Sequence, residues 1–449
     1  MKIACLSLAP LFGEFVLGGS QKVLNDIILG LRNNKIEVRV FSPQELNNCD
    51  ESFIGDVKIE KILNLSGVFP SPFEVPLYEI QELSEKLSKI SNWADRIYLH
   101  GDGWFLRDEF FNKKIISGIH DLVYQESLSS VFSFFSNSTI LPSNYLLETI
   151  HSSLNKKNFN LNNFFVIPNS IPSPIKNSKK KKSNSNLDIL FPHRPDPRKG
   201  FNQAILIANK FAKTGKWENV ILRSSKFNKS LNKDYKNSNY FNQENYNEFL
   251  SNKGQIIFHD WIPFKKMSNF YSSGDLTLCP GDFIESFGLV PLESIVNETP
   301  ALCSSVGAFR ELKNVPGIEI IPYGDLDQFV ERGIAILNNQ VEVSNGKKFV
   351  LQKFSEQKMI DSYVNQFKDP DRKIQYDFNY PQTESKNFHL APWCTLENKM
   401  IYHDYLGWLP ETKNKFQLTD SNKLSVDSSI MEYGIKKRIL IPRYIDEYR

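Results

Sequence analysis

The feature that most constrains the fold is a repeated pattern of a short apolar run, a turn, and then apolar residues at helical spacing. The pattern begins at Lys2–Leu8 and starts again at Leu187–Phe191. Nearly continuous apolar runs are typical of parallel strands that helices cover on both faces. The repeat therefore predicts two facing Rossmann-like α/β domains, each with a doubly wound sheet. We expect a deep cleft between them, with ligands at the carboxyl ends of the strands.

Other apolar runs predict the remaining strands and helices. In the first half the expected strands are Val38–Phe41, Arg96–His100, Ile115–Ile119, Thr139–Pro142 and Phe165–Pro168. In the second half they are Val220–Leu222, Gln255–Phe258, Leu276–Leu278, Ala301–Ser304 and Glu319–Pro322. Helical spacing predicts an amphipathic helix at Phe201–Lys213 and one long helix from about Ser344 to Phe367.

A polar, lysine-rich stretch separates the two halves and predicts a linker at residues 176–186. A basic patch for phosphate or lipid headgroups is the alternative interpretation of these lysines. The expected domains are therefore residues 1–175 and 187–367. Residues 368–449 are rich in aromatics and have few helical periods, so they are expected to form an appended segment that packs on this body.

Composition excludes several classes of protein. With 23% charged residues and 41% hydrophobic residues the chain is not disordered, and a net charge of +3 does not indicate a nucleic-acid partner. No apolar run is long enough for a transmembrane helix, although contact with a membrane surface stays open. The five scattered cysteines include Cys5, Cys279 and Cys303 in apolar runs, which indicates free thiols and a cytoplasmic location.

Two candidate features lie at the ends of expected strands in the first half. Gly18 and Gly19 follow the first strand and precede a helix, where glycine lets backbone N–H groups approach a phosphate. An ordinary turn is the alternative. His120 follows the strand Ile115–Ile119, where it either contacts a substrate or forms only a local hydrogen bond.

The second half supplies two further features. Arg194, Arg198 and Lys199 lie between its first strand and first helix, where guanidinium and ammonium groups suit phosphate oxygens. A solvated turn is the alternative. Glu285 opens the next feature, a segment that leads into a helix carrying Glu293. Glu285 either binds sugar hydroxyls or only interacts with the helix dipole, and Glu293 is otherwise a surface residue.

Taken in this order, the motifs resemble those of retaining GT-B glycosyltransferases of the family 4 type. The shared features are Gly18-Gly19, His120, Arg194 with Lys199-Gly200, and an E-x7-E segment from Glu285 to Glu293. Val166–Ile171 also resembles the family's V-I-P-N-G-I segment, with Ser170 in place of glycine. The resemblance covers roughly residues 1–367 and implies a GT-B fold with a C-terminal extension.

The resemblance also implies roles for these residues. Arg194 and Lys199 would bind the donor diphosphate and stabilise the leaving group, and Glu293 would bind the donor ribose. Glu285 would bind the donor sugar and stabilise its developing positive charge, while His120 would contact the sugar near the reacting carbon. The other implied donor-binding residues are Gly18, Gly19, Ser286, Phe287, Gly288 and Leu289.

The expected reaction is transfer of a sugar from a UDP-, GDP-, ADP- or dTDP-sugar to an unidentified hydroxyl on a glycan, a lipid-linked acceptor or a small molecule. No metal or other cofactor is expected, because the D-x-D strings at Asp325–Asp327 and Asp369–Asp371 are interpreted as structural. The loops Gly101–Arg107 and Gln125–Ser136 are expected to bind the acceptor. A non-catalytic partner subunit, a sugar-nucleotide epimerase and a phosphorylase remain as alternatives.

Two loops depart from the family pattern. Arg223-Ser224-Ser225 stands where the family often has Gly-x-Gly, and the segment Ser305–Glu311 keeps one glycine, Gly307. These departures bear on the identity of the donor more than on the class of reaction.

Overall fold

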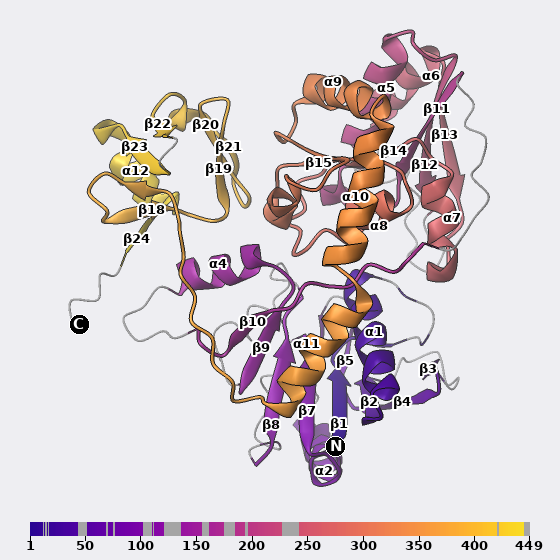
Figure 1. Cartoon of the computed structure of the whole chain (residues 1–449), viewed down its shortest axis with the longest axis vertical. Coiled ribbons are helices and arrows are strands. Elements are labelled where there is room, and N and C mark those ends of the chain that lie inside the picture. Colours follow the sequence, from indigo (N-terminus) through magenta and orange to yellow (C-terminus); the bar gives the residue numbers. More distant parts are fainter. Residues whose placement is uncertain are drawn as a thin grey trace. The chain divides into compact units, whose positions relative to one another are not determined.

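The computed structural model describes residues 1–11, 13, 16, 18–43, 52–68, 71–74, 77–101, 110, 112–120, 136–154, 161–174, 185–193, 196–226, 242–419 and 422–443. Arg194, nearly all of the expected linker and nearly all of the two expected acceptor loops lie outside the described residues. The chain divides into two compact units (Figure 1). Unit 1 contains Met1–Ser170 and Glu356–Asn379, and unit 2 contains Ile171–Ser355 and Tyr380–Arg443.

Unit 1 is built on a sheet of eight strands among the described residues, in the order β10-β9-β8-β7-β1-β2-β4-β3. Its strands pair in parallel except for β3 with β4. The strands are β1 (Lys2–Ser7), β2 (Glu37–Pro43), β3 (Phe53–Ile54), β4 (Val57–Leu63), β7 (Arg96–His100), β8 (Lys114–Gly118), β9 (Ser138–Leu141) and β10 (Phe164–Val166).

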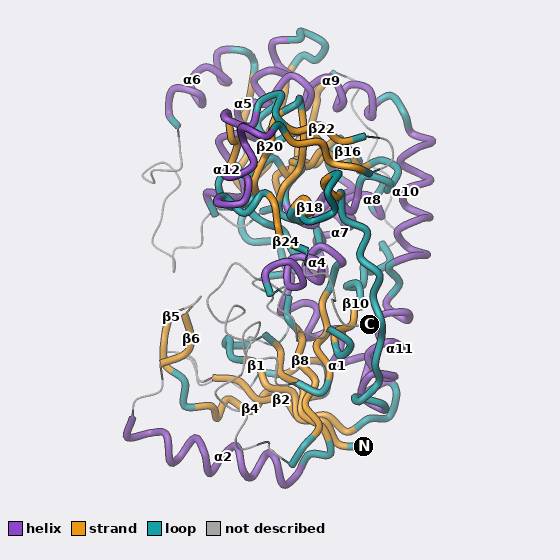
Figure 2. Tube along the Cα trace, turned by 90° about the vertical axis from the view of Figure 1, so that its left-hand side faces the viewer, coloured by secondary structure: helices purple, strands orange, loops and turns teal. Residues whose placement is uncertain are grey.

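The helices of unit 1 bury apolar side chains against its sheet. They are α1 (Gly19–Asn33), α2 (Ile80–Trp93), α4 (Asn144–Ser153) and α11 (Glu356–Lys368). In α1 the side chains of Val23, Leu24 and Ile27 are fully buried. Figure 2 shows α2 along one side of the sheet, and a separate hairpin of β5 (Ser66–Val68) and β6 (Ser71–Glu74).

Unit 2 has a parallel sheet in the order β13-β12-β11-β14-β15-β16. The strand order reverses between β11 and β14, which is the switch point where ligands bind in doubly wound sheets. The strands are β11 (Asn186–Phe191), β12 (Asn219–Ser225), β13 (Gly254–His259), β14 (Leu276–Cys279), β15 (Ala301–Ser304) and β16 (Ile318–Ile321). The helices are α5 (Phe201–Lys213), α6 (Gln243–Ser251), α7 (Met267–Ser272), α8 (Leu289–Val296), α9 (Leu326–Leu337) and α10 (Gln340–Lys353).

One long helix was expected near the end of the second half, and the structure corrects this. Two helices, α10 and α11, occupy the segment, and the first ends at Lys353. The apolar face of α10 packs in unit 2 through Val343 and Val350, whereas α11 packs in the core of unit 1 through Met359 and Ile360. The boundary expected at residue 367 therefore moves, because α11 buries its apolar face in the other unit.

The segment that follows α11 is also divided between the units, with Tyr380–Arg443 in unit 2. We call residues 380–443 the C-terminal module (yellow in Figure 1). It contains a five-stranded sheet of order β22-β23-β17-β18-β24 and a three-stranded sheet of order β19-β20-β21. Its elements are β17 (Gln382–Thr383), β18 (Phe388–Leu390), β19 (Cys394–Glu397), β20 (Met400–His403), β21 (Gly407–Leu409), β22 (Phe416–Leu418), β23 (Lys423–Val426), α12 (Met431–Lys436) and β24 (Leu440–Pro442).

The C-terminal module has its own apolar core, which includes Trp393, Ile401 and Phe416. Across the described part of the chain, Cys5, Cys279, Cys303 and Cys394 are buried free thiols, and Cys49 lies outside the described residues. In the same part of the chain, no helix combines the length and apolar character that crossing a membrane requires.

Candidate active site

The loops that follow β11 and β14 are held together backbone to backbone at the switch point of unit 2. Gly200 has a φ of +85°, and a Cβ there would lie 2.6 Å from the Cα of Gly281. A Cβ on Gly281 would lie 2.0 Å from the carbonyl oxygen of Arg198. The Phe283 N–H donates to that same oxygen at 2.9 Å. Neither glycine position has room for a side chain, so the two loops lie in direct backbone contact there.

Lys199 and Glu285, two predicted site residues, meet across these loops. The Lys199 ammonium donates to Oε1 of Glu285 and lies 3.5 Å from the centre of the Phe283 ring. The two side chains are 13% and 17% exposed. An ammonium between a carboxylate and an aromatic face is held by ion pairing and by a cation–π contact.

Arg198 lies in the same turn but is already engaged by a neighbour. Its Nε and Nη2 donate to the two carboxylate oxygens of Asp196, at 3.1 and 2.9 Å. Its side chain is nearly half exposed. The paired Arg198 therefore fits the solvated-turn interpretation better than Lys199 does.

The loop after β15 holds the backbone of Glu285. Gly307 has a φ of +59°, and a Cβ there would lie 2.7 Å from the carbonyl oxygen of Glu285. The Ala308 N–H donates to the same oxygen at 2.8 Å. The one glycine that this loop retains is thus at the point of closest approach to Glu285.

The residues after Glu285 lead into the amino end of α8. Helix α8 begins at Leu289, and within the described part of the chain no side chain caps it, because Gly288 is the N-cap residue. Uncapped N–H groups at the start of a helix are donors for an anion. Phe287 is buried in the core of unit 2, so only its backbone is suited to ligand contact.

Glu293 lies inside α8 rather than on the surface, at 9% exposed. Its Oε2 accepts a hydrogen bond of 3.0 Å from the hydroxyl of Tyr271, on α7. Burial and then the Glu293 carboxylate raise the pKa of Tyr271 well above its ordinary value, so this hydroxyl remains a donor. Tyr271 had no sequence signal, because its contact with Glu293 exists only through helix packing.

His193, at the end of β11, is a buried neighbour of Lys199 that the sequence did not single out. Its Nε2 lies 3.2 Å from the carbonyl oxygen of Leu278 on β14. Burial, with a smaller contribution from the Lys199 charge, lowers the pKa of His193 to about 3. The ring is therefore neutral at pH 7 and connects the two strands on either side of the switch point.

In unit 1, Gly18 and Gly19 lie where expected, at the start of α1. Gly18 is the N-cap residue in extended backbone, and among the described residues nothing beyond its chain neighbours lies within 4 Å of a Cβ built there. Neither strain nor crowding therefore requires glycine at Gly18. Glycine at this position leaves the start of α1 uncovered by a side chain.

His120 follows β8 in unit 1 and is buried at 7% exposed. Among the described residues, neither of its ring nitrogens has a hydrogen-bond partner. Its ring centre lies 4.4 Å from that of His100, which ends β7. Burial and the neighbouring His100 lower the pKa of His120 well below its ordinary value, so His120 is neutral at pH 7.

His100 connects His120 with the start of α1. Its Nε2 lies 2.9 Å from both the hydroxyl and the carbonyl oxygen of Ser20, and its Nδ1 lies 3.2 Å from the Tyr98 hydroxyl. Burial lowers the pKa of His100 to about 4. The strand Arg96–His100 was predicted from the sequence. His100 itself was not singled out, because its place beside His120 follows from the position of β7 between β1 and β8 in the sheet.

The two D-x-D strings have structural partners. Asp325 caps α9 by accepting the Gln328 N–H at 3.1 Å. Asp371 accepts hydrogen bonds from Lys114 and Asn137, at 3.1 and 3.0 Å. Among the described residues, no group of three His, Cys, Asp or Glu side chains is arranged to hold a metal ion.

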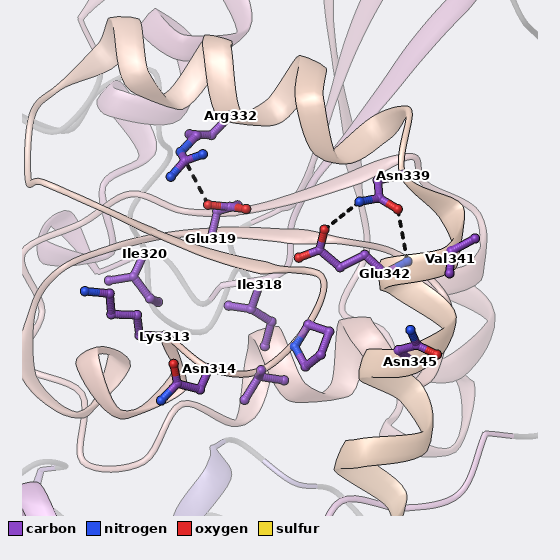
Figure 3. Close-up of a pocket in the computed structure, with 12 residues that line it drawn as sticks. Lys313, Asn314, Ile318, Glu319, Ile320, Arg332, Asn339, Val341, Glu342 and Asn345 are labelled. Atoms are coloured by element: carbon purple, nitrogen blue, oxygen red, sulfur yellow. Dashed lines mark hydrogen bonds and ion pairs between the residues drawn. The ribbon is translucent and has the colours of Figure 1, made fainter.

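A pocket of about 550 Å³ lies beside the edge strand β16, between α9 and α10 (Figure 3). Arg332 Nε lies 3.5 Å from Glu319 Oε2, and Asn339 Nδ2 donates to Glu342 at 2.8 Å. The predicted site residues are not among those that line it. This pocket is therefore separate from the candidate active site.

The two α/β units, with a charged site at the switch point of unit 2, have the architecture of the GT-B class of folds. Alignments with solved structures support this assignment of the fold. HepE of Anabaena, solved with UDP, aligns with a TM-score of 0.61 and 15% identity, over 82% of this chain and 100% of that one. Sucrose-phosphate synthase of Thermosynechococcus elongatus aligns with a TM-score of 0.58 and 16% identity, over 82% and 98% of the two chains.

Residues 173–349 match the model of the family "Glycosyl transferases group 1". An uncharacterised glycosyltransferase of Methanocaldococcus jannaschii is 28% identical over 124 residues. That match spans 26% of this chain and 32% of the relative. Lys199, Glu285 and Glu293 lie within the segment that this model matches, whereas Gly18, Gly19 and His120 lie outside it.

Proposed function

We propose that this chain is a retaining glycosyltransferase that moves a sugar from a nucleotide-diphosphate sugar to an acceptor hydroxyl. The observation that carries the proposal is the pairing of Lys199 with Glu285 at the switch point of unit 2, just before the uncapped start of α8. Ligands of doubly wound sheets bind at this edge. A cation, a carboxylate and free N–H groups together suit a donor that carries both a diphosphate and a sugar.

The cations act on the leaving group. When the bond between the anomeric carbon and the phosphate oxygen breaks, negative charge develops on the diphosphate and positive charge on the sugar ring. Lys199 and the N–H groups at the start of α8 stabilise the negative charge, in the way that preorganised donors stabilise transition states. Arg194, which lies outside the described residues, is assigned the same role from its motif. On this assignment neither a metal nor another cofactor takes part.

Glu285 acts on the sugar. A donor diphosphate competes with Glu285 for Lys199, and this competition frees the carboxylate to face the developing positive charge. The acceptor oxygen bonds to the anomeric carbon on the face that the phosphate leaves, and the acceptor proton passes to the departing phosphate oxygen. Attack on that face retains the configuration of the sugar.

The remaining motif residues are assigned to donor binding. Glu293, which accepts a hydrogen bond from Tyr271, binds the ribose hydroxyls. His120 is neutral at pH 7 and therefore contacts the sugar by hydrogen bonding rather than by charge. Gly18 and Gly19 place no side chain of their own at the start of α1 and are assigned to contact with a phosphate or sugar group.

UDP-sugars are the first donors to test, because HepE has been solved in complex with UDP and with UDP-glucose. GDP-, ADP- and dTDP-sugars complete the set. The acceptor is a hydroxyl of a glycan, a lipid-linked acceptor or a small molecule. A cytoplasmic location is part of the proposal, since the described cysteines are buried free thiols.

The test compares nucleotide release from the four donor classes by the wild type and by K199A, E285A and K210A. Lys210 is the matched control, because it lies on α5 in an exposed ion pair with Asp327. We expect K199A and E285A to lose about 100- to 1,000-fold in kcat and K210A to keep wild-type activity. Full activity in K199A or E285A would contradict the site assignment.

Two further measurements separate the alternatives. Proton NMR of the product reports the anomeric configuration, and an inverted product would contradict retention. Activity is expected to survive EDTA, so strict dependence on Mg²⁺ or Mn²⁺ would contradict the metal-independent mechanism. Nucleotide binding without release from any donor would favour the non-catalytic partner subunit.

A further inference from the structure

The C-terminal module contacts the loops at the carboxyl edge of the unit 2 sheet through hydrogen bonds and an ion pair. Its first anchor is Arg310, which lies in the short 3-10 helix Gly307–Leu312 after β15. The Arg310 guanidinium donates to the Pro392 carbonyl oxygen at 3.0 Å and pairs with the Asp404 carboxylate. Its Nε also donates to the carbonyl oxygen of Ser305, at 3.3 Å. One side chain thus joins the module to the loop after β15.

The ion pair of Arg310 and Asp404 is largely removed from solvent. The Asp404 side chain has 0% exposure and the Arg310 side chain 19%. A buried carboxylate is costly without a cation, so neither partner is readily dispensable. The planar guanidinium serves three acceptors in different directions, which a lysine ammonium on a flexible stem does not reproduce.

A second anchor joins the module to the loop after β16. Trp408 Nε1 donates to the Tyr323 carbonyl oxygen at 2.9 Å, and the rings of Tyr323 and Tyr402 lie 5.4 Å apart. The Tyr323 hydroxyl accepts a hydrogen bond of 3.0 Å from Gln203, on the first turn of α5. Through Tyr323 the module is therefore connected to α5, which begins two residues after Lys199.

The loop after β15, which contains Arg310, also contacts the backbone of Glu285. The 3-10 helix of Arg310 begins at Gly307, whose missing side chain allows close approach to the Glu285 backbone. The next residue, Ala308, donates its N–H to the Glu285 carbonyl oxygen at 2.8 Å. A shift of this helix therefore moves the backbone of Glu285 directly.

We propose that Arg310 is a positioning residue for Glu285. Through the Arg310–Asp404 pair, the C-terminal module fixes the position of Glu285 in the donor site. The inference rests on the proposed function for its effect on catalysis. The module holds the 3-10 helix through Arg310, and the 3-10 helix holds Glu285. Loss of the pair displaces the carboxylate that faces the developing charge, while Lys199 and the start of α8 remain in place.

The test uses the full-length variants R310K and D404N, with R332A as the control. Arg332 is an arginine of the same unit, on α9, whose side chain is 55% exposed and pairs with Glu319 rather than with the module. Hydrogen exchange of the Ala308 amide measures the coupling without any substrate, and donor turnover measures its effect on catalysis. We expect Ala308 exchange to rise about tenfold or more in R310K and D404N, and to stay unchanged in R332A.

In turnover, we expect kcat to fall about 10- to 100-fold in both variants with the donor KM nearly unchanged, because small displacements of a catalytic group cost rate rather than binding. W408F, which removes the donor to Tyr323 but keeps an aromatic ring, is the milder variant if D404N unfolds. Its expected result is faster exchange at Ala308 with a smaller loss of kcat.

The outcomes separate this inference from the proposed function. Unchanged Ala308 exchange in folded D404N overturns the inference, even where the wild type transfers sugar. Faster exchange with unchanged kcat also overturns it, since Glu285 would then not depend on the module. A wild type that turns over no donor overturns the proposed function, and the exchange rates alone then decide whether the module holds the Glu285 loop.

Discussion

At the scale of single residues, the candidate site depends on glycines as much as on charged groups. Lys199 and Glu285 meet only because Gly200 and Gly281 let two loops touch through their backbones. The sequence predicted Lys199 and Glu285 from residue type and order. It did not predict Tyr271, His193 or His100, whose contacts arise from packing between separate elements.

Gly200 supplies the first prediction at this scale. Gly200→Ala is expected to cost about 3 kcal/mol or more of unfolding free energy, because it adds strain at positive φ and a clash with the Gly281 backbone. Gly215→Ala is the control, since its φ is +65° and nothing in the described part of the chain beyond its chain neighbours lies within 4 Å of a Cβ there. Denaturant unfolding of both variants measures the difference. Equal losses in the two variants would show that the loops do not touch as described.

His100 supplies a second prediction, on pH. Its pKa is about 4 in the folded protein and 6.5 in an ordinary setting, so below pH 6.5 the unfolded chain takes up a proton that the folded chain does not. Stability therefore falls as the pH drops from 6.5 towards 4. Between pH 7 and pH 4.5 this proton uptake is expected to lower the unfolding free energy of the wild type by on the order of 2 kcal/mol. His100→Gln is expected not to show this part of the loss. Urea unfolding at the two pH values tests this, and an identical loss in variant and wild type would contradict it.

At the scale of elements, the apolar pattern predicted most strands and helices of the two sheets. Arg96–His100, Phe201–Lys213 and Ala301–Ser304 have the expected bounds, because each is a continuous apolar or amphipathic run between clear turns. The segment expected as one long helix forms α10 and α11 instead. Its apolar periodicity continues through the break, so the local pattern does not reveal that the two faces pack in different cores.

At the scale of the whole molecule, the chain does not divide into units in simple order. Helix α11 returns to unit 1, and the C-terminal module then belongs to unit 2. The aromatic residues of the module predicted that it packs on the body, but not where. Its attachment depends on Arg310 and Asp404, which are far apart in the sequence and carry no recognisable spacing.

The buried thiols give a prediction at this scale. Cys279 and Cys303, on strands of the unit 2 sheet, are expected to become reactive towards an alkylating reagent together with Cys394 of the module, because a buried ion pair joins the module to a loop of that sheet. Burial raises the pKa of both Cys303 and Cys394, so these thiols react slowly in the folded protein. Pulsed alkylation along a denaturant series, read by mass spectrometry, measures each thiol. Reaction of Cys394 at clearly lower denaturant than Cys279 would contradict joint unfolding of the module and unit 2.

The sequence by itself determined the class of fold and the residue types at the carboxyl edges of the strands, because apolar period and local turn chemistry act over a few residues. The tertiary structure alone decided which of those residues meet. The pairing of Lys199 with Glu285, the contact of Tyr271 with Glu293 and the connection from Asp404 through Arg310 to Glu285 all join distant segments. Such contacts depend on close packing and on the satisfaction of buried charges and hydrogen bonds, which no short stretch of sequence specifies.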